Sequence, residues 1–278
     1  MKEPNAPSLS HGSASPSLRP ATLLAAALLA GAFLSGMFLH PGTARAGTEI
    51  VRLATLDWEP YVGSTLLDNG YVTEVVREAF RRSGYAVAIR FLPWTRAVEQ
   101  ATQNEWDGIF PVYDAPERRR KFRLSAPLPA AALGFFKRAG EDIHYAKLRD
   151  LAPYRIGVVR GYMNTDAFDH ADYLQKSAVN DDLGNIRRLL AHRIDLFVAD
   201  KVVGDYLVRK HMPADADKIE FVEPPLGPTQ LFVAFPKNLP EAAEYQRAFN
   251  AGLDAMETDG TLDAILRKHG FQGKLRLR

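Results

Sequence analysis

Short apolar runs alternate with longer amphipathic stretches in the first half of the chain. The short runs at Glu49 to Thr55, Ala86 to Phe91 and Gly108 to Val112 predict three strands. Between them, Gly70 to Gly84 repeats apolar residues at helical spacing, and Pro93 to Asn104 predicts a second helix. Strands separated by helices indicate a parallel sheet covered on both faces, whose ligands gather at the carboxyl ends of the strands.

The same alternation returns in the second half. Arg155 to Val159 predicts a strand, Asp181 to His192 a helix, and Ile194 to Asp200 a strand that leads into a helix from Lys201 to Lys210. Two extended apolar stretches, residues 127–136 and 231–235, separate this part from the first and from two helices at the end of the chain. The alternation indicates an α/β protein, and the chain after the N-terminal segment is long enough for one large or two small domains.

The N-terminal segment has the pattern of a secretory signal peptide. An apolar run from Ala21 to Leu39 ends at His40-Pro41-Gly42 and is followed by Ala44-Arg45-Ala46, a small-residue cleavage site. Cleavage after Ala46 is expected. The alternative is an uncleaved anchor, because the run is close to the ~20 apolar residues that span a bilayer.

Charge and cysteine content narrow the class of protein. Removing residues 1–46 takes away three basic residues and one acidic residue, which leaves 32 of each and a net charge near zero. This balance argues against a nucleic-acid partner. The chain has no cysteine, so it has neither a disulfide nor a lipidated cysteine, and we expect a soluble periplasmic protein of a bacterium with an outer membrane. Its seven histidines lack metal-ligand spacing, so neither a metal nor a cofactor is expected.

Candidate binding residues follow the predicted strands. Trp58 and Tyr61 come after the first strand and Trp94 after the second, where two indoles could sandwich a flat or apolar ligand or cover a cation. Core packing is the alternative for each ring. After the third strand, Pro116 suits the first turn of a helix, which places Arg118 where its guanidinium could bind a carboxylate. The alternative is a solvated basic face, because Arg118 opens the run RRRKFR.

Three segments around Arg118 carry a family resemblance. The run from Asp107, DGIF, then APER ending at Arg118, then LSAP ending at Pro127, resembles the "D-A-I … T-P-E-R … F-S-x-P" run of the family 3 extracellular solute-binding proteins. These are the periplasmic receptors of ABC importers. The resemblance implies the type II periplasmic-binding-protein fold, two α/β lobes joined by a two-strand hinge with the ligand cleft between them. The expected divisions are a signal peptide over 1–46, lobe 1 over 47–134 plus 235–278, and lobe 2 over 135–234.

The resemblance also implies roles for individual residues. Arg118 matches the arginine that clamps the ligand's α-carboxylate, and Trp58 and Trp94 match positions of two ligand-contacting aromatic residues. Asp200 matches the aspartate that receives the ligand's amino group, although it is equally suited to be the N-cap of the following helix. The remaining candidates are the aromatic residues near these positions and the turn that contacts the ligand from lobe 2: Tyr61, Tyr113, Gly161, Tyr162 and Met163.

Two departures from the family pattern bear on the ligand. The segment from Pro111 to Pro116 is about one residue shorter than in amino-acid binders and lacks their serines and threonine. The family's acidic contact after the first strand falls near Thr55, which leaves only Asp57 nearby. Asp114 is also close enough in sequence to neutralise Arg118.

These observations predict a protein that binds rather than breaks bonds. It would be a monomer that closes on a small polar or amino-acid-like ligand and delivers it to an inner-membrane ABC permease. One alternative is an enzyme on the same fold, resembling the periplasmic cyclohexadienyl dehydratases, with Glu59, Asp114 or Asp200 as the acid. Another is a sensor that passes ligand occupancy to a separate signalling partner.

Overall fold

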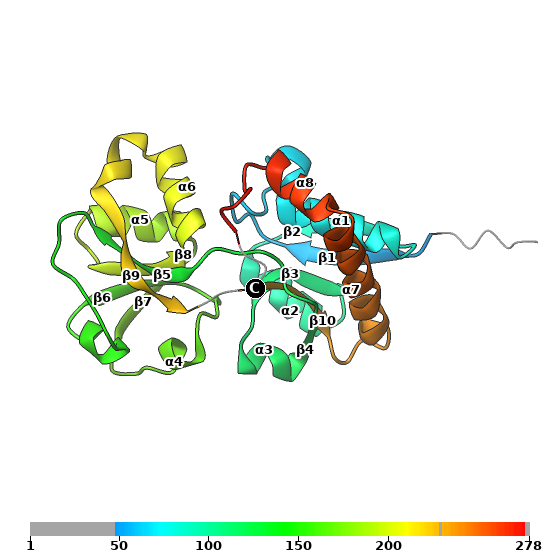
Figure 1. Ribbon diagram of the computed structural model, residues 1–278. Coiled ribbons are helices and arrows are strands. Elements are labelled where there is room, and N and C mark those ends of the chain that lie inside the picture. Colours follow the sequence, from blue (N-terminus) through cyan, green and yellow to red (C-terminus); the bar gives the residue numbers. More distant parts are fainter. Residues whose placement is uncertain (1–47, 228–229, 276–278) are drawn as a thin grey trace, which may run out of the picture. The chain divides into compact units, whose positions relative to one another are not determined.

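A computed structural model describes residues 48–227 and 230–275 (Figure 1). The predicted signal peptide, residues 1–46, lies outside these residues. Two five-stranded sheets organise the described chain, and each has its own helices and hydrophobic core. None of the described helices is long and apolar enough to cross a membrane.

The first sheet has the strand order β2-β1-β3-β10-β4. The strands β1 (Ile50–Thr55), β2 (Ala86–Phe91) and β3 (Gly108–Tyr113) run parallel, as their separation by helices predicted. The last two, β10 (Leu231–Pro236) and β4 (Phe122–Leu124), complete the sheet, with β10 antiparallel to both neighbours. The carboxyl ends of β1 and β3 therefore open at the same edge.

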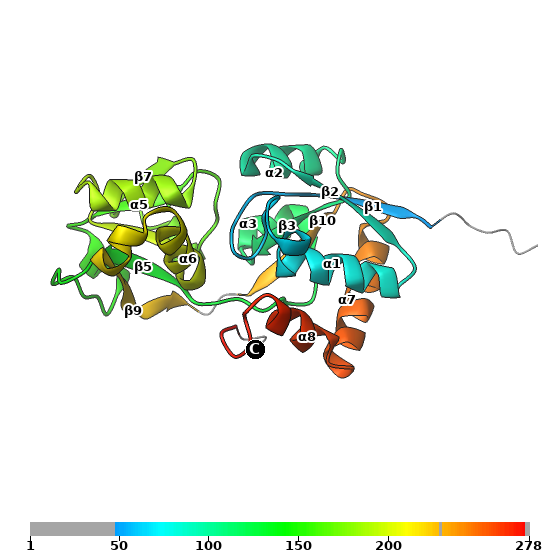
Figure 2. The same ribbon diagram turned by 90° about the horizontal axis from the view of Figure 1, so that it is seen from above.

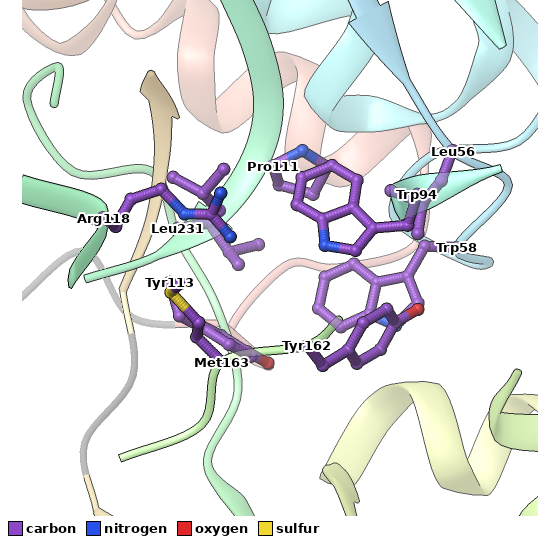
Figure 3. Close-up of a pocket in the computed structure, with 10 residues that line it drawn as sticks. Leu56, Trp58, Trp94, Pro111, Tyr113, Arg118, Tyr162, Met163 and Leu231 are labelled. Atoms are coloured by element: carbon purple, nitrogen blue, oxygen red, sulfur yellow. The ribbon is translucent and has the colours of Figure 1, made fainter. Parts of the chain in front are cut away.

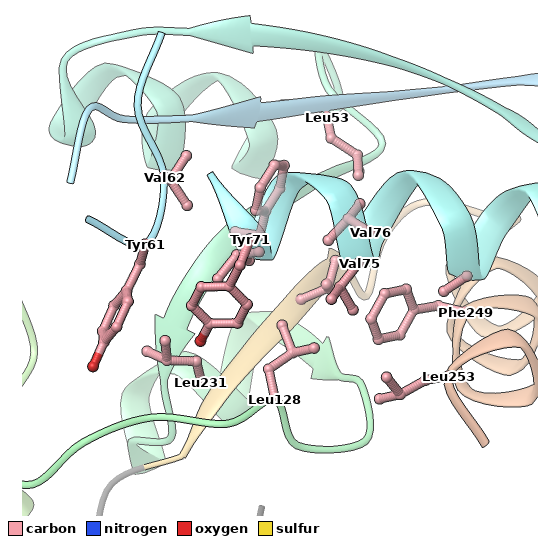
Figure 4. Packing of buried hydrophobic residues seen from close by; sticks show 14 of the residues in the cluster. Leu53, Tyr61, Val62, Tyr71, Val75, Val76, Leu128, Leu231, Phe249 and Leu253 are labelled. Carbon is pink, nitrogen blue, oxygen red and sulfur yellow. The ribbon is translucent and has the colours of Figure 1, made fainter. Parts of the chain in front are cut away.

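Helices cover both faces of this sheet (Figure 2). On one face lie α1 (Tyr71–Arg82), α7 (Ala242–Thr258) and α8 (Thr261–Lys268), whose apolar side chains form the largest core (Figure 4). The other face is covered by α2 (Trp94–Thr102). The backbones of α1 and α7 approach so closely that a Cβ atom on Gly252 would lie 1.9 Å from the carbonyl oxygen of Ala79. We call this sheet with its helices lobe 1.

The second sheet has the order β7-β6-β8-β5-β9 and, with its helices, forms lobe 2. Helices α5 (Asp182–Leu190) and α6 (Lys201–His211) pack on one face, and the short α4 (Asp166–Asp169) lies on the other. The period of two in β5 puts Phe135 in one core and Phe136 in the other. The strands of this lobe are β5 (Leu133–Arg138), β6 (Arg155–Val159), β7 (Gln175–Val179), β8 (Leu196–Asp200) and β9 (Ile219–Gly227).

The chain crosses between the sheets twice. It leaves lobe 1 after β4 and enters lobe 2 at β5, and it returns between β9 and β10. The two crossings pair where the amide of Leu128 donates to the carbonyl oxygen of Leu231 at 2.7 Å. The predicted boundaries near residues 134 and 235 stay predictions.

Candidate ligand-binding site

A pocket enclosing about 30 Å³ lies where the two lobes meet, at the ends of β1 and β3 (Figure 3). We call it the aromatic pocket. The guanidinium of Arg118 and the rings of Trp58 and Trp94 turn toward the same space. Six of the nine predicted site residues line it, together with four that were not predicted. The lining residues are Leu56, Trp58, Trp94, Pro111, Val112, Tyr113, Arg118, Tyr162, Met163 and Leu231.

Arg118 is the charged residue of the pocket. It lies in α3 (Pro116–Lys121), and only 3% of it is exposed. Its Cζ atom lies 5.6 Å from the centre of the Trp94 ring and 5.7 Å from that of Phe122. Burial lowers its pKa to about 10, with the charge of Glu117 opposing the shift, so the guanidinium is still charged at neutral pH. Within the described chain, its Nε atom has no hydrogen-bond partner.

Asp114 pairs with the next arginine instead. Arg119 donates from Nε and Nη2 to the two carboxylate oxygens of Asp114, each at 2.6 Å. This pair is exposed, whereas Arg118 is buried. Of the two neighbouring arginines, Arg119 therefore lies on the surface and Arg118 in the pocket. The suggestion that Asp114 neutralises Arg118 is therefore not supported by this geometry.

A second polar group of the lining residues also lacks a partner within the described chain. The hydroxyl of Tyr113 is buried, and no described residue bonds to it. Burial raises the pKa of Tyr113 well above its usual value, so the group remains an O–H donor at neutral pH. Arg118 thus offers donors to whatever occupies the aromatic pocket, whereas the nearest charges to the Tyr113 hydroxyl are those of Asp200 and Asp182.

The two predicted tryptophans, Trp58 and Trp94, make different contacts around the pocket. Trp58 packs edge-on against Tyr61 and Tyr113, with ring centres 5.2 Å and 5.9 Å apart. Trp94 reaches across to lobe 2, where its Nε1 donates to the carbonyl oxygen of Gly161 at 3.1 Å. A positive φ of 77° at Gly161 forms this turn, and a Cβ atom there would lie 2.9 Å from Cγ2 of Thr95. Gly161 therefore serves the approach of the lobes and does not itself line the pocket.

Tyr61 and Asp200 lie outside the lining of the aromatic pocket. The hydroxyl of Tyr61 donates to Oδ1 of Asp200 at 3.0 Å, which joins the two lobes. The same oxygen caps α6 by accepting from the amides of Val202 and Val203. Burial raises the pKa of Asp200 to about 7, although these hydrogen bonds oppose the shift. Asp200 is thus an N-cap, and its contact with a ligand stays a prediction.

Comparison with known proteins agrees with this architecture. A family model of the bacterial extracellular solute-binding proteins, family 3, matches residues 58–272. The chain belongs to this family. The predicted resemblance and the two-lobed type II fold are thereby confirmed. A search of curated proteins found no significant match to this solute-binding protein.

Solved structures share the fold at low sequence identity. The GluR0 ligand-binding core from Nostoc punctiforme, in complex with L-glutamate, is 19% identical, with a TM-score of 0.67 over 80% of this chain and 99% of that one. An ancestral arginine-binding protein bound to arginine is also 19% identical, with a TM-score of 0.66 over 79% and 97% of the two chains. A histidine kinase sensor domain is 20% identical, with a TM-score of 0.67 over 80% and 96%. At these identities the likeness shows the fold alone.

One buried acid of the solute-binding protein was missed by sequence reasoning. Asp182, the first residue of α5, is 4% exposed, and burial raises its pKa to about 7. Hydrogen bonds from Trp58 of lobe 1 and Tyr162 of lobe 2 oppose this shift, and the charge of Asp181 adds to it. In sequence, the pair Asp181-Asp182 reads as a helix start, and Asp181 is indeed the N-cap, accepting from the amide of Gly184 at 2.7 Å.

The four missed lining residues are apolar. Leu56 directly follows β1, Pro111 and Val112 belong to β3, and Leu231 begins β10. Their positions at strand ends were the available signal, but apolar side chains at such positions also fit a hydrophobic core.

A cluster away from the pocket brings Asp68, Glu74 and His269 together, with their potential ligand atoms within 4.8 Å of one another. The ammonium of Lys268 lies 2.6 Å from Asp68 and 2.8 Å from Glu74, and His269 contacts Glu74 at 2.7 Å. The lysine thus supplies a positive charge where a metal ion would lie.

Proposed function

We propose that this protein captures a small solute bearing a carboxylate in the periplasm and delivers it to the membrane permease of an ABC importer. Its signal peptide would be removed after Ala46 before it acts. Membership of the solute-binding family supports the general role. The lining of the aromatic pocket by both lobes supports capture by lobe closure.

The observation that carries the proposal is the unpaired Arg118. Burying an isolated charge costs several kcal/mol unless a partner compensates for it. Arg118 is buried, and no ion pair to it is found among the described residues. A planar carboxylate accepts two hydrogen bonds from a guanidinium fork, so a bound carboxylate would compensate the charge.

Contacts between the lobes explain how binding would favour closure. Tyr162 and Met163 of lobe 2 complete a pocket whose other walls belong to lobe 1. A ligand that touches both sides binds the closed state more tightly than the open state and so shifts the population toward it. Closure by this route is a hinge motion about the two crossing segments.

The three acids proposed for the enzyme alternative already have partners within the protein. Glu59 forms an ion pair with Lys210 at 2.6 Å, Asp114 pairs with Arg119, and Asp200 caps a helix. None of the three lines the aromatic pocket. We expect no product when the protein is incubated with prephenate or arogenate; formation of a dehydrated product would establish the enzyme instead.

A thermal-shift screen against amino acids, amines and small carboxylates tests the binding role. We expect compounds with a carboxylate to raise the melting temperature, because ligands that bind only the folded state stabilise it.

In Arg118→Gln, affinity should fall by about 2–5 kcal/mol, roughly 30-fold or more, since a buried charge pair is lost. Arg119→Gln is the matched control and should bind as the wild type does. Equal affinity in the two variants would contradict the role of Arg118.

Delivery to an importer requires a separate measurement. Cells lacking this protein should take up the identified solute more slowly, and the wild-type gene should restore uptake. Unchanged uptake would point to the sensor alternative, in which binding reports to a signalling partner.

A further inference from the structure

Apart from Arg118 and the tyrosine hydroxyls, the walls of the aromatic pocket are apolar. Leu56, Pro111, Val112 and Leu231 of lobe 1 are aliphatic or proline side chains, and Met163 faces them from lobe 2. Apolar walls stabilise a ligand in proportion to the apolar surface that it buries. If the carboxylate of a ligand binds Arg118, the rest of the ligand, which we call its body, contacts apolar side chains. Such side chains favour a hydrocarbon body.

None of the ten lining residues is a carboxylate. The two nearest buried acids lie behind the rings: Asp182 accepts hydrogen bonds from Trp58 and Tyr162, and Asp200 accepts one from Tyr61. Their hydrogen bonds hold aromatic side chains and helix α6 in place. Asp114, which lies outside the lining of the aromatic pocket, is paired with Arg119.

An ammonium group would be poorly accommodated here. It would lose its hydration in an apolar pocket, and no acidic residue lines the pocket to replace the lost water. It would also lie near the charge of Arg118, and like charges in a site of low dielectric repel strongly. The carboxylate of the same ligand would meet the guanidinium of Arg118, whose Nε atom has no partner among the described residues.

We propose that the solute of this protein is a small monocarboxylate with an aromatic or aliphatic body and no ammonium group. The inference rests on the proposed function and specifies its ligand class. The carboxylate binds the guanidinium of Arg118. The body lies between the indoles of lobe 1 and the Tyr162 and Met163 side chains of lobe 2.

Room for the body comes from the lobe 2 side. At about 30 Å³, the pocket as it stands holds roughly one or two water molecules. Met163 separates this pocket from a neighbouring cavity of about 520 Å³ whose lining includes the carboxylates of Glu117, Asp166 and Asp169. Because methionine is unbranched and flexible, a shift of Met163 or a small separation of the lobes would enlarge the aromatic pocket.

Matched ligand pairs test the inference on the wild-type protein. Titration calorimetry would compare 3-phenylpropionate with L-phenylalanine and 4-methylpentanoate with L-leucine, members of a pair differing in the α-ammonium group. We expect the carboxylate in at least one pair to bind at least tenfold more tightly than its amino acid. We expect 2-phenylethylamine, which lacks a carboxylate, not to bind.

The outcomes separate this inference from the proposed function. Tighter or equal binding of the amino acids would overturn the ligand class and leave a carboxylate-binding protein standing. If no member of either pair bound, the ligand class would be overturned as well, and the comparison of Arg118→Gln with Arg119→Gln in the wider screen would decide the proposed function.

A gain of binding gives a second test. Met163→Asp places a carboxylate on the apolar wall, where it would pair with an ammonium group, and Met163→Asn is the uncharged control of the same size. We expect Met163→Asp to reduce the preference for the carboxylate over its amino acid at least fivefold more than Met163→Asn does. An equal effect of both substitutions would overturn the argument from the missing acid.

Discussion

The two faces of the cleft bury charges of opposite sign. Lobe 1 presents Arg118, a buried cation without an ion-pair partner among the described residues, surrounded by aromatic rings. Lobe 2 buries Asp182 and Asp200, whose hydrogen-bond donors include Trp58 and Tyr61 of lobe 1. Neither acid contributes to the pKa shift of Arg118, which burial and Glu117 account for.

The unpaired cation of lobe 1 and the hydrogen-bonded acids of lobe 2 suit different roles. A cation that lacks a partner and is desolvated binds an external anion strongly, because the cost of burying it has already been met by the fold. Asp182 and Asp200 instead accept hydrogen bonds from Trp58 and Tyr61 of lobe 1. These bonds join the two lobes and orient the aromatic side chains around the pocket. In the function that we propose, lobe 1 would select the ligand's charge, and lobe 2 would fix the shape of the closed pocket.

The largest effect that we predict is a pH dependence from the acids of lobe 2. The pKa of Asp182 is about 7 in the folded protein and near 3.8 in the unfolded chain, so the folded state holds an extra proton between these values. The free energy of unfolding should therefore fall as pH rises from about 4 to 7, by up to about 1.4 kcal/mol per pH unit from this group. Asp182→Asn should reduce that slope and stabilise the protein at pH 8. Urea unfolding at pH 5, 6, 7 and 8 measures both effects.

Asp181→Asn is the control for this prediction. Its side chain is exposed, and asparagine is an equally good N-cap, so the slope should change little beyond the loss of repulsion on Asp182. A wild-type stability that stays level from pH 5 to pH 7.5, or an Asp182→Asn profile that matches the wild type, would contradict the buried-acid argument.

The elements of both lobes were largely predictable from periodicity. β2 and β6 have the predicted bounds, and α1 lies within the predicted helix, because continuous apolar runs and helical spacing differ clearly in these segments. Local sequence also identified Asp200 as a position for an N-cap, which it is. These signals are local, so they need no knowledge of tertiary contacts.

The site was harder to predict because its chemistry depends on which neighbour is buried. Arg118 and Arg119 are adjacent and chemically identical, and only the fold places one against Trp94 and the other beside Asp114. The resemblance to the family singled out Arg118, whereas composition alone described a basic surface. Asp182 carried no signal, since its partners Trp58 and Tyr162 are far away in sequence.

A smaller effect is expected from the indole that bridges the two faces. Trp94 covers Arg118 and donates to Gly161, so Trp94→Ala should weaken ligand binding by about 2–3 kcal/mol through lost aromatic contact and the lost interlobe hydrogen bond. Trp94→Phe keeps a ring and should lose about 1 kcal/mol. Titration calorimetry with the solute found in the screen would measure both variants.

Trp106→Phe provides the comparison for the Trp94 variants. The Trp106 indole donates to Gln100 within lobe 1 at 3.0 Å and does not line the pocket, so this variant should bind normally. If Trp94→Phe lost as much affinity as Trp94→Ala, the hydrogen bond across the lobes would matter more than the ring, and the role that we give to lobe 1 would need revision.

The smallest effect concerns the ion pair at the edge of the cleft. Lys210 of lobe 2 contacts Glu59 of lobe 1 at 2.6 Å, but the lysine side chain is 38% exposed, so the pair should contribute at most about 1 kcal/mol to closure. Lys210→Gln should lower the closed fraction of the ligand-free protein slightly, as measured by small-angle X-ray scattering in low salt, and added salt should remove the difference from wild type. Lys218→Gln, which breaks a pair with Asp215 inside lobe 2, should leave closure unchanged. A large loss of closure in Lys210→Gln would mean that surface charge, rather than the interlobe hydrogen bonds of Trp58, Tyr61 and Trp94, holds the lobes together.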